Sequence, residues 1–194
     1  MGRPMPTPIG HALAGLTLAL AALPRGKSPG AFARAARAAR VDWRLVALLA
    51  SLAAAPDLDL VFQQHRTATH SFVSIALVTI LAGVVTGKVT PSPGGRAWRL
   101  AVLCGAAWGS HLLLDWLGAD TSTPRGFQAF WPFSDRWFIS GWDIFRRIER
   151  RDVLAPETIL QNALAVGQEF LILLPVVAAA WWMRRRARKA PAYE

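Results

Sequence analysis

The chain has 194 residues, of which 53% are hydrophobic and 18% charged, and its 22 Lys and Arg against 12 Asp and Glu give a net charge of +10. Soluble domains average about 45–50% apolar and about 25% charged residues, so this composition favours a membrane protein and excludes a disordered chain, which is poor in apolar residues. The single cysteine, Cys104, excludes a disulfide framework and a cysteine-based zinc ribbon.

Five apolar segments predict an all-α, multi-pass membrane helical bundle of about five spans. In chain order they are residues 8–23, 45–55, 71–87, 98–117 and 159–183. A span needs about 17–25 apolar residues, and the uncharged third segment is just long enough. The first two are short, so helices buried in a soluble protein remain an alternative. The first is also open to interpretation as a cleaved signal peptide, because it contains the triplet Ala19-Leu20-Ala21.

The distribution of basic residues predicts the orientation of the bundle. With five spans, one membrane face collects 14 Lys and Arg and the other 8. Because the more basic face is normally cytoplasmic, we expect a bacterial inner-membrane protein with a cytoplasmic C-terminus. The basic run at residues 184–189 suits anionic lipid headgroups. We expect membrane lipids as partners and no nucleic acid.

The predicted organisation is one membrane-embedded domain over residues 1–183 and a basic tail over 184–194. Its longest connection, residues 118–157, is rich in aromatic residues and interrupted by Gly and Pro, which disfavours a continuous helix. We therefore expect a loop that lies on the membrane surface or folds back over the helix ends.

Ionisable groups are concentrated near the ends of the predicted spans. In the five-span topology all four histidines and three aspartates fall on one membrane face, the outer one: His11, Asp57, Asp59, His65, His70, His111 and Asp115. Such groups are expensive at membrane depth and usually face a protein interior or a water-filled cavity. Singly, each is more often a core histidine, a hydrogen-bonded pair or a helix cap, but their convergence favours a metal site.

The spacing of these residues refines the interpretation. His111 and Asp115 are four residues apart, so they share one helix face. Pro56 disfavours a helical Ala55, so we expect Asp57 and Asp59 to come from a turn or an extended piece. Imidazole and carboxylate ligands suit Zn, Mn or Fe, Zn first, and more than four candidate ligands leave open one or two ions. A bound metal activates water, which predicts hydrolysis.

Five short motifs, taken together and in this order, resemble the YdjM-type family of bacterial inner-membrane proteins, which are regarded as metal-dependent hydrolases. They are Thr7-Pro8-x-x-His11, Pro56-Asp57-x-Asp59, His65-Arg66-x-x-Thr69-His70-Ser71, Ser110-His111-x-x-x-Asp115 and Trp131-Pro132-Phe133-Ser134-Asp135-Arg136. The resemblance covers roughly residues 5–140. It implies that the metal set is His11, Asp57, Asp59, His70, His111 and Asp115, with His65 and Arg66 as accessory residues. A more distant similarity is to zinc-dependent phospholipase C and its nuclease relatives, which are all-helical.

The predicted function is a membrane-bound metal-dependent hydrolase, in which metal-activated water attacks an ester or phosphoester of a lipid or envelope component. In that scheme His65 or an unliganded carboxylate is the general base, Arg66 stabilises the developing negative charge, and the aromatic loop closes over the substrate. Two alternatives stay open: a metal or proton transporter, and a non-catalytic membrane protein with a structural metal site.

Overall fold

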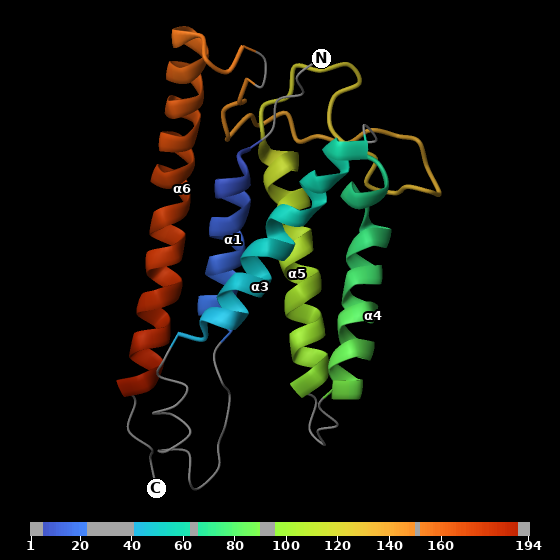
Figure 1. Ribbon diagram of the computed structural model, residues 1–194, viewed down its shortest axis with the longest axis vertical. Coiled ribbons are helices and arrows are strands. Elements are labelled where there is room, and N and C mark those ends of the chain that lie inside the picture. Colours follow the sequence, from blue (N-terminus) through green and yellow to red (C-terminus); the bar gives the residue numbers. More distant parts are fainter. Residues whose placement is uncertain (1–5, 23–40, 63–65, 90–95, 150–151, 190–194) are drawn as a thin grey trace, which may run out of the picture.

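The computed structural model describes residues 6–22, 41–62, 66–89, 96–149 and 152–189 (Figure 1). Over these ranges the chain is helical, with no strand beyond two isolated bridges, so the predicted all-α class is confirmed. The α-helices are α1 (Pro8–Ala21), α3 (Trp43–Ala54), α4 (Phe72–Val89), α5 (Arg96–Leu117) and α6 (Pro156–Lys189). Two 3-10 helices, η1 (Ala55–Phe62) and η2 (Ala68–His70), connect α3 to α4.

In the described part of the chain, two helices are long and apolar enough to cross a membrane, namely Ala97–Leu117 in α5 and Pro156–Arg186 in α6. Helix α1 has 14 residues and α3 has 12, so neither is longer than about 21 Å at 1.5 Å per residue. That is less than the hydrocarbon core of about 30 Å. The five predicted spans are therefore not confirmed, and the membrane assignment of the fold rests on α5 and α6.

One local prediction was wrong. The chain does not leave helical geometry before Pro56, because Ala55 keeps φ −64° and ψ −31° and the backbone tightens into η1. Pro56 is tolerated there because a proline in the first turn of a helix removes an N–H that has no partner in any case. The last helix extends beyond the predicted apolar segment 159–183 into the basic tail and ends at Lys189, since arginine is a good helix former and suits a helix C-terminus.

Helix α5 is central, with α4, α3 and α1 packed against it, and α1 lies between α3 and α6 (Figure 1). The interface of α1, α3 and α5 is built mainly from small buried side chains, including Ala19, Ala53 and Ala107. Gly15 of α1 lies so close to α3 that a Cβ atom there would be 2.4 Å from the Leu49 carbonyl oxygen. Small residues thus let the backbones of α1 and α3 approach closely.

One end of the bundle brings together the segments that carry the predicted site. The start of α1, the end of α5, η1 and η2 all lie there, and the segment after α5 folds back over them (Figure 1). Backbone hydrogen bonds fasten this segment, with Ile144 N donating to Leu117 O at 2.8 Å and Phe72 N donating to Ala129 O at 2.8 Å. Of the two expected arrangements of the aromatic loop, the structure has the one that covers the helix ends.

Replacing Gly15 by Ala is expected to destabilise the fold, because the new methyl group meets backbone atoms of α3 that cannot rotate away. Overpacking of this kind costs about 1–3 kcal/mol. Thermal unfolding of detergent-purified protein measures the loss. The matched control is Gly167→Ala in α6, where a Cβ meets nothing within 4 Å and helix propensity gains about 0.5–1 kcal/mol. Equal melting temperatures for Gly15→Ala and the wild type would contradict the packing described here.

Candidate metal centre

The structure brings the six residues of the implied metal set into one buried cluster. His11, His70 and His111 have exposed fractions of 0%, and Asp57, Asp59 and Asp115 of 8%, 7% and 6%. They come from α1, η1, η2 and α5. Only tertiary packing joins these elements, so the cluster is a property of the assembled end of the bundle.

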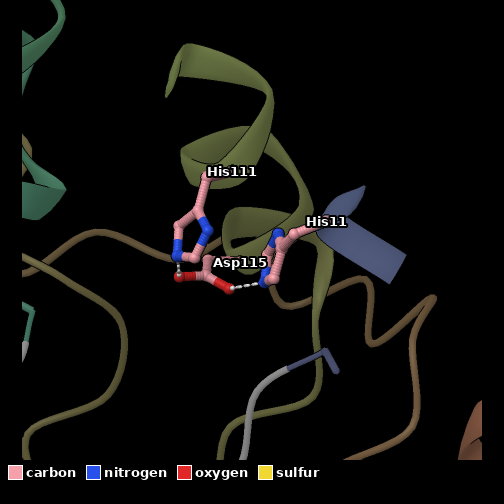
Figure 2. A group of neighbouring side chains, drawn as sticks. All are labelled: His11, His111 and Asp115. Atoms are coloured by element: carbon pink, nitrogen blue, oxygen red, sulfur yellow. Dashed lines mark ion pairs between the residues drawn. The ribbon is translucent and has the colours of Figure 1, made fainter. Parts of the chain in front are cut away.

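The carboxylate of Asp115 is at the centre of the cluster. Its Oδ1 lies 3.4 Å from Nε2 of His11, and its Oδ2 lies 3.3 Å from Nε2 of His111 and 3.3 Å from Nε2 of His70. Figure 2 shows the carboxylate between the rings of His11 and His111, with one oxygen directed at each. The same two rings are stacked, with centroids 3.7 Å apart. Three imidazoles therefore present the same nitrogen to one carboxylate.

A second set of contacts places Asp57 and His70 beside His111. The Nε2 atoms of His70 and His111 are 3.1 Å apart, and Oδ1 of Asp57 is 3.7 Å from Nε2 of His111. Two groups of possible ligand atoms result, His11 with His111 and Asp115, and Asp57 with His70 and His111. Within each group the ligand atoms lie within 4.8 Å of one another. His111 belongs to both.

The outward-facing nitrogens of two imidazoles are held by other groups. Nδ1 of His111 is 2.8 Å from the Ala53 carbonyl oxygen, and Nδ1 of His70 is 3.1 Å from Oδ2 of Asp59. Thr69 Oγ1 also donates a hydrogen bond to Asp59. Asp59 thus contacts the side of His70 that faces away from Asp115. In metal sites this is the position of a carboxylate that fixes ring orientation and tautomer.

These contacts fit a bound cation better than a set of direct hydrogen bonds. Within the described part of the chain, neither nitrogen of His11 and neither oxygen of Asp115 has a hydrogen-bond partner, although all four atoms are buried. Metal–ligand bonds of about 2.0–2.1 Å put neighbouring ligand atoms of a tetrahedron about 3.3–3.4 Å apart. The distances around Asp115 match that spacing, so the residues present fit a divalent ion.

The electrostatics of the cluster favour positive charge. Burial by itself lowers the pKa of His70, yet polar contacts with Asp115 and Asp59 and the charges of both carboxylates outweigh burial and raise that pKa to about 9. Three carboxylates buried in one place require such compensation, because an isolated buried charge is strongly unfavourable. A divalent cation supplies it as directly as a proton does.

Of the two predicted accessory residues, His65 and Arg66, the structure describes only Arg66. His65 lies outside the described residues. Arg66 is buried with φ +75°, and its guanidinium Nη1 lies 2.6 Å from Oδ2 of Asp120 while also donating to Ser122 Oγ at 2.8 Å. Its backbone N–H donates to Asp59 at 3.3 Å. These contacts fasten the segment after α5 to the segment before η2, which is a structural role that the sequence reasoning missed.

Two further buried carboxylates fasten neighbouring segments, and one of them, Glu169, was not predicted. Asp120 accepts hydrogen bonds from the backbone of Ser122 and Gly126 and pairs with Arg66. Glu169 of α6 has an exposed fraction of 0% and accepts hydrogen bonds from Thr7, the first residue of the motif that contains His11. A signal for Glu169 was present in the sequence, because a glutamate in an apolar span calls for a specific partner.

The comparison with known proteins is limited to one family. A family model described as YdjM inner membrane protein matches residues 5–188. The match extends well beyond the motifs, which end near residue 140, and it includes nearly all of α6 and the first part of the basic tail. No curated protein and no solved structure matches the chain.

Replacing Asp120 by Asn is expected to lower the stability at neutral pH by about 3 kcal/mol, because it leaves Arg66 as a buried charge without its partner. Burial raises the pKa of Asp120, but hydrogen bonds from Gly126 and Ser122 and the charge of Arg66 outweigh it and lower that pKa. The stabilisation is therefore fully present above the ordinary pKa of about 3.9 and is lost as the pH falls through the lowered native value.

Thermal unfolding across a pH series tests this expectation. The melting temperatures of the wild type and Asp120→Asn should differ most at pH 7 and approach each other below about pH 4. Asp135→Asn is the control, because Asp135 is exposed in the same segment. A gap that stays constant down to low pH would contradict the ion pair as its source.

Proposed function

Because the chain belongs to the YdjM inner membrane protein family, we propose that it is a membrane-embedded, metal-dependent hydrolase with its active centre at the buried histidine and aspartate cluster. The observation that carries the proposal is the arrangement around Asp115. Three imidazole Nε2 atoms lie 3.3–3.4 Å from its two oxygens, away from solvent. Packing alone gives no reason for the nitrogens of His11 and the oxygens of Asp115, which lack hydrogen bonds among the described residues, to be buried at such distances.

The contacts favour one divalent ion over two. Nδ1 of His111 is occupied by the Ala53 carbonyl, so His111 offers only Nε2 to the inside of the cluster. That nitrogen has a single lone pair, and both possible ligand groups depend on it. We assign His11, His70, His111 and Asp115 as ligands. Asp59 orients His70 instead of binding the ion itself, which refines the six-ligand set implied by the family resemblance.

The remaining carboxylate has a chemical role in this scheme. A divalent ion held here would supply an activated water and polarise an ester or phosphoester bond. Asp57, whose Oδ1 lies 3.7 Å from Nε2 of His111, is near enough to the ligands to accept the proton that the attacking water releases. Arg66 is assigned no part in the reaction, because its guanidinium pairs with Asp120.

The depth of the cluster supports a lipid or envelope ester as the substrate. His111 and Asp115 lie in the last two turns of the apolar stretch Ala97–Leu117. The end of a span coincides with the boundary between hydrocarbon and headgroups, and the ester linkages of lipids lie at that boundary. The ring of Phe127, 6.4 Å from that of His70, belongs to the segment that covers the cluster and excludes bulk water.

Removing a ligand is expected to remove both the metal and the activity. We expect wild-type protein purified in detergent to contain a divalent metal and His111→Ala and Asp115→Ala to contain only background amounts, since each substitution deletes a central contact. All three proteins are then incubated with ester and phosphoester lipids. Hydrolysis should be lost in both variants and retained in the control Ser110→Ala, whose hydroxyl bonds the backbone of Ala107.

Two other results would replace the proposal. If the wild type carries ions into vesicles but hydrolyses no ester, and His111→Ala abolishes the ion flux, the protein is a transporter. Metal content without turnover or flux, together with a lower melting temperature for His111→Ala, would identify a structural metal site.

The distribution of Lys and Arg leads to a separate expectation about orientation. We propose that the C-terminus is cytoplasmic and that the cluster faces the opposite side of the inner membrane, because the basic end of α6 belongs to the more basic face. A reporter enzyme active only in the cytoplasm, fused after Glu194, should be active. The same reporter inserted at the exposed Arg125 should be inactive. The reverse pattern would contradict the orientation.

A further inference from the structure

Helix α6 holds a buried carboxylate against the start of α1. Glu169 lies within the apolar stretch Pro156–Arg186 and has an exposed fraction of 0%. Helices α1 and α6 lie side by side and run in the same direction (Figure 1). A carboxylate at this depth is costly unless it has specific partners, and its partners are all at the N-terminus of α1.

Thr7 connects Glu169 to the first turn of α1. Its backbone N–H donates to Oε1 of Glu169 at 2.6 Å, and its hydroxyl donates to Oε2. Thr7 is also the N-cap residue, with Oγ1 accepting from Gly10 N at 3.1 Å and its carbonyl accepting from His11 N at 3.2 Å. Two successive hydrogen bonds thus lead from Glu169 to the backbone of His11.

Gly10 shows how closely the carboxylate approaches α1. A Cβ atom at this position would lie 2.7 Å from Oε2 of Glu169, so any larger residue there requires the carboxylate to shift. Negative charge at a helix N-terminus is also favourable, because the first N–H groups are unpaired and the helix dipole is positive there. Packing and electrostatics therefore fix the same position for Glu169.

The other end of α1 has the complementary partner. Nη1 of Arg184, a buried residue of α6, donates to the Ala19 carbonyl oxygen in the last turn of α1 at 3.3 Å. Helix α6 thus supplies an acceptor to the N-terminal end of α1 and a cation to the C-terminal end, as the helix dipole requires. Of these two contacts of α6 with α1, the one made by Glu169 is close to His11, because Gly10 directly precedes His11 in the chain.

We propose that Glu169 is a positioning residue that fixes the first turn of α1 and thereby holds His11 against Asp115. The inference rests on the proposed function in so far as His11 is a metal ligand. Glu169 itself contacts neither the ion nor the substrate. Its role is to keep one ligand in place, as residues beyond the ligands do in other metal sites, where their loss costs about 10–100-fold in metal affinity.

The test compares Glu169→Gln and Gly10→Ala with two controls on α6. The first variant removes the charge, and the second displaces the carboxylate without changing it. Arg184→Gln loosens the far end of α1 and controls for a general loss of helix docking. Glu157→Gln alters an exposed glutamate of the same helix. The measurements are binding of Co²⁺ followed by its visible absorption spectrum, and hydrogen exchange of the amides of Gly10 and His11 in metal-free protein.

Positioning predicts that Glu169→Gln and Gly10→Ala bind Co²⁺ about 10–100-fold more weakly with an altered spectrum, and that the amides of Gly10 and His11 exchange faster. Arg184→Gln should lower the melting temperature while its Co²⁺ affinity and spectrum stay those of the wild type. Unchanged exchange and affinity in Glu169→Gln would overturn the inference, and so would equal losses of affinity in Glu169→Gln and Arg184→Gln.

The two proposals fail separately in this experiment. If wild-type protein binds no Co²⁺ and no Zn²⁺, the proposed metal centre is wrong, and the exchange rates alone decide on Glu169. Faster exchange at Gly10 and His11 in Glu169→Gln, but not in Arg184→Gln or Glu157→Gln, then supports its role in fixing the first turn of α1. Equal exchange at these two amides in the wild type, Glu169→Gln, Arg184→Gln and Glu157→Gln overturns that role.

Discussion

The structure depends on the burial of one carboxylate, that of Asp115, among three imidazoles. Taking a carboxylate out of water is strongly unfavourable unless a cation or hydrogen-bond donors replace the water. Here the replacements come from His111 on the same helix and from His11 and His70 on two other helical segments, so α1, η2 and α5 have to meet at one end of the bundle for the charge to be tolerated. The polar cluster thus constrains the fold as much as the fold positions the cluster.

The neighbouring polar contacts extend outward from this cluster in layers. Asp59 and the Ala53 carbonyl hold the outer nitrogens of His70 and His111. Around them, the ion pair of Arg66 with Asp120 fastens the covering segment, and Glu169 fastens the first turn of α1. This is how a small bundle holds side chains from four segments within hydrogen-bonding distances of one another.

The placement of the cluster relates the fold to the proposed chemistry. A site at the bilayer midplane would suit the passage of an ion across the membrane, whereas the proposed placement of α5 as a span puts its end at the level of lipid headgroups and their ester bonds. The covering segment is built of aromatic residues and turns in place of a helix, so it can lie flat over the helix ends. A buried polar cluster in that proposed position suits the proposed hydrolysis of an ester that reaches it from the lipid.

The sequence alone determined the class of the protein and the residues of the cluster, because both depend on local information. Apolar runs of helical length indicate membrane helices, and His111 and Asp115 share a helix face at any tertiary arrangement. The number of spans was less predictable, since α1 and α3 are apolar but too short to cross a bilayer alone, and hydropathy does not show which helices pack inside others. The 3-10 geometry of η1 was not predicted. The backbone preference of the residue before a proline does not show whether the chain leaves helical geometry or tightens into a 3-10 helix.

Tertiary structure decided the roles within the cluster. Asp57 and Asp59 are near neighbours of the same type in the chain, and only the packing of η1 against η2 and α5 places one beside Nε2 of His111 and the other behind His70. Arg66 was expected near the substrate, but a carboxylate 54 residues away in the chain pairs with it. Glu169 reaches Thr7 across 162 residues. Partners so distant in sequence leave no periodic pattern, because their pairing is set by how the helices pack and not by the residues that flank them.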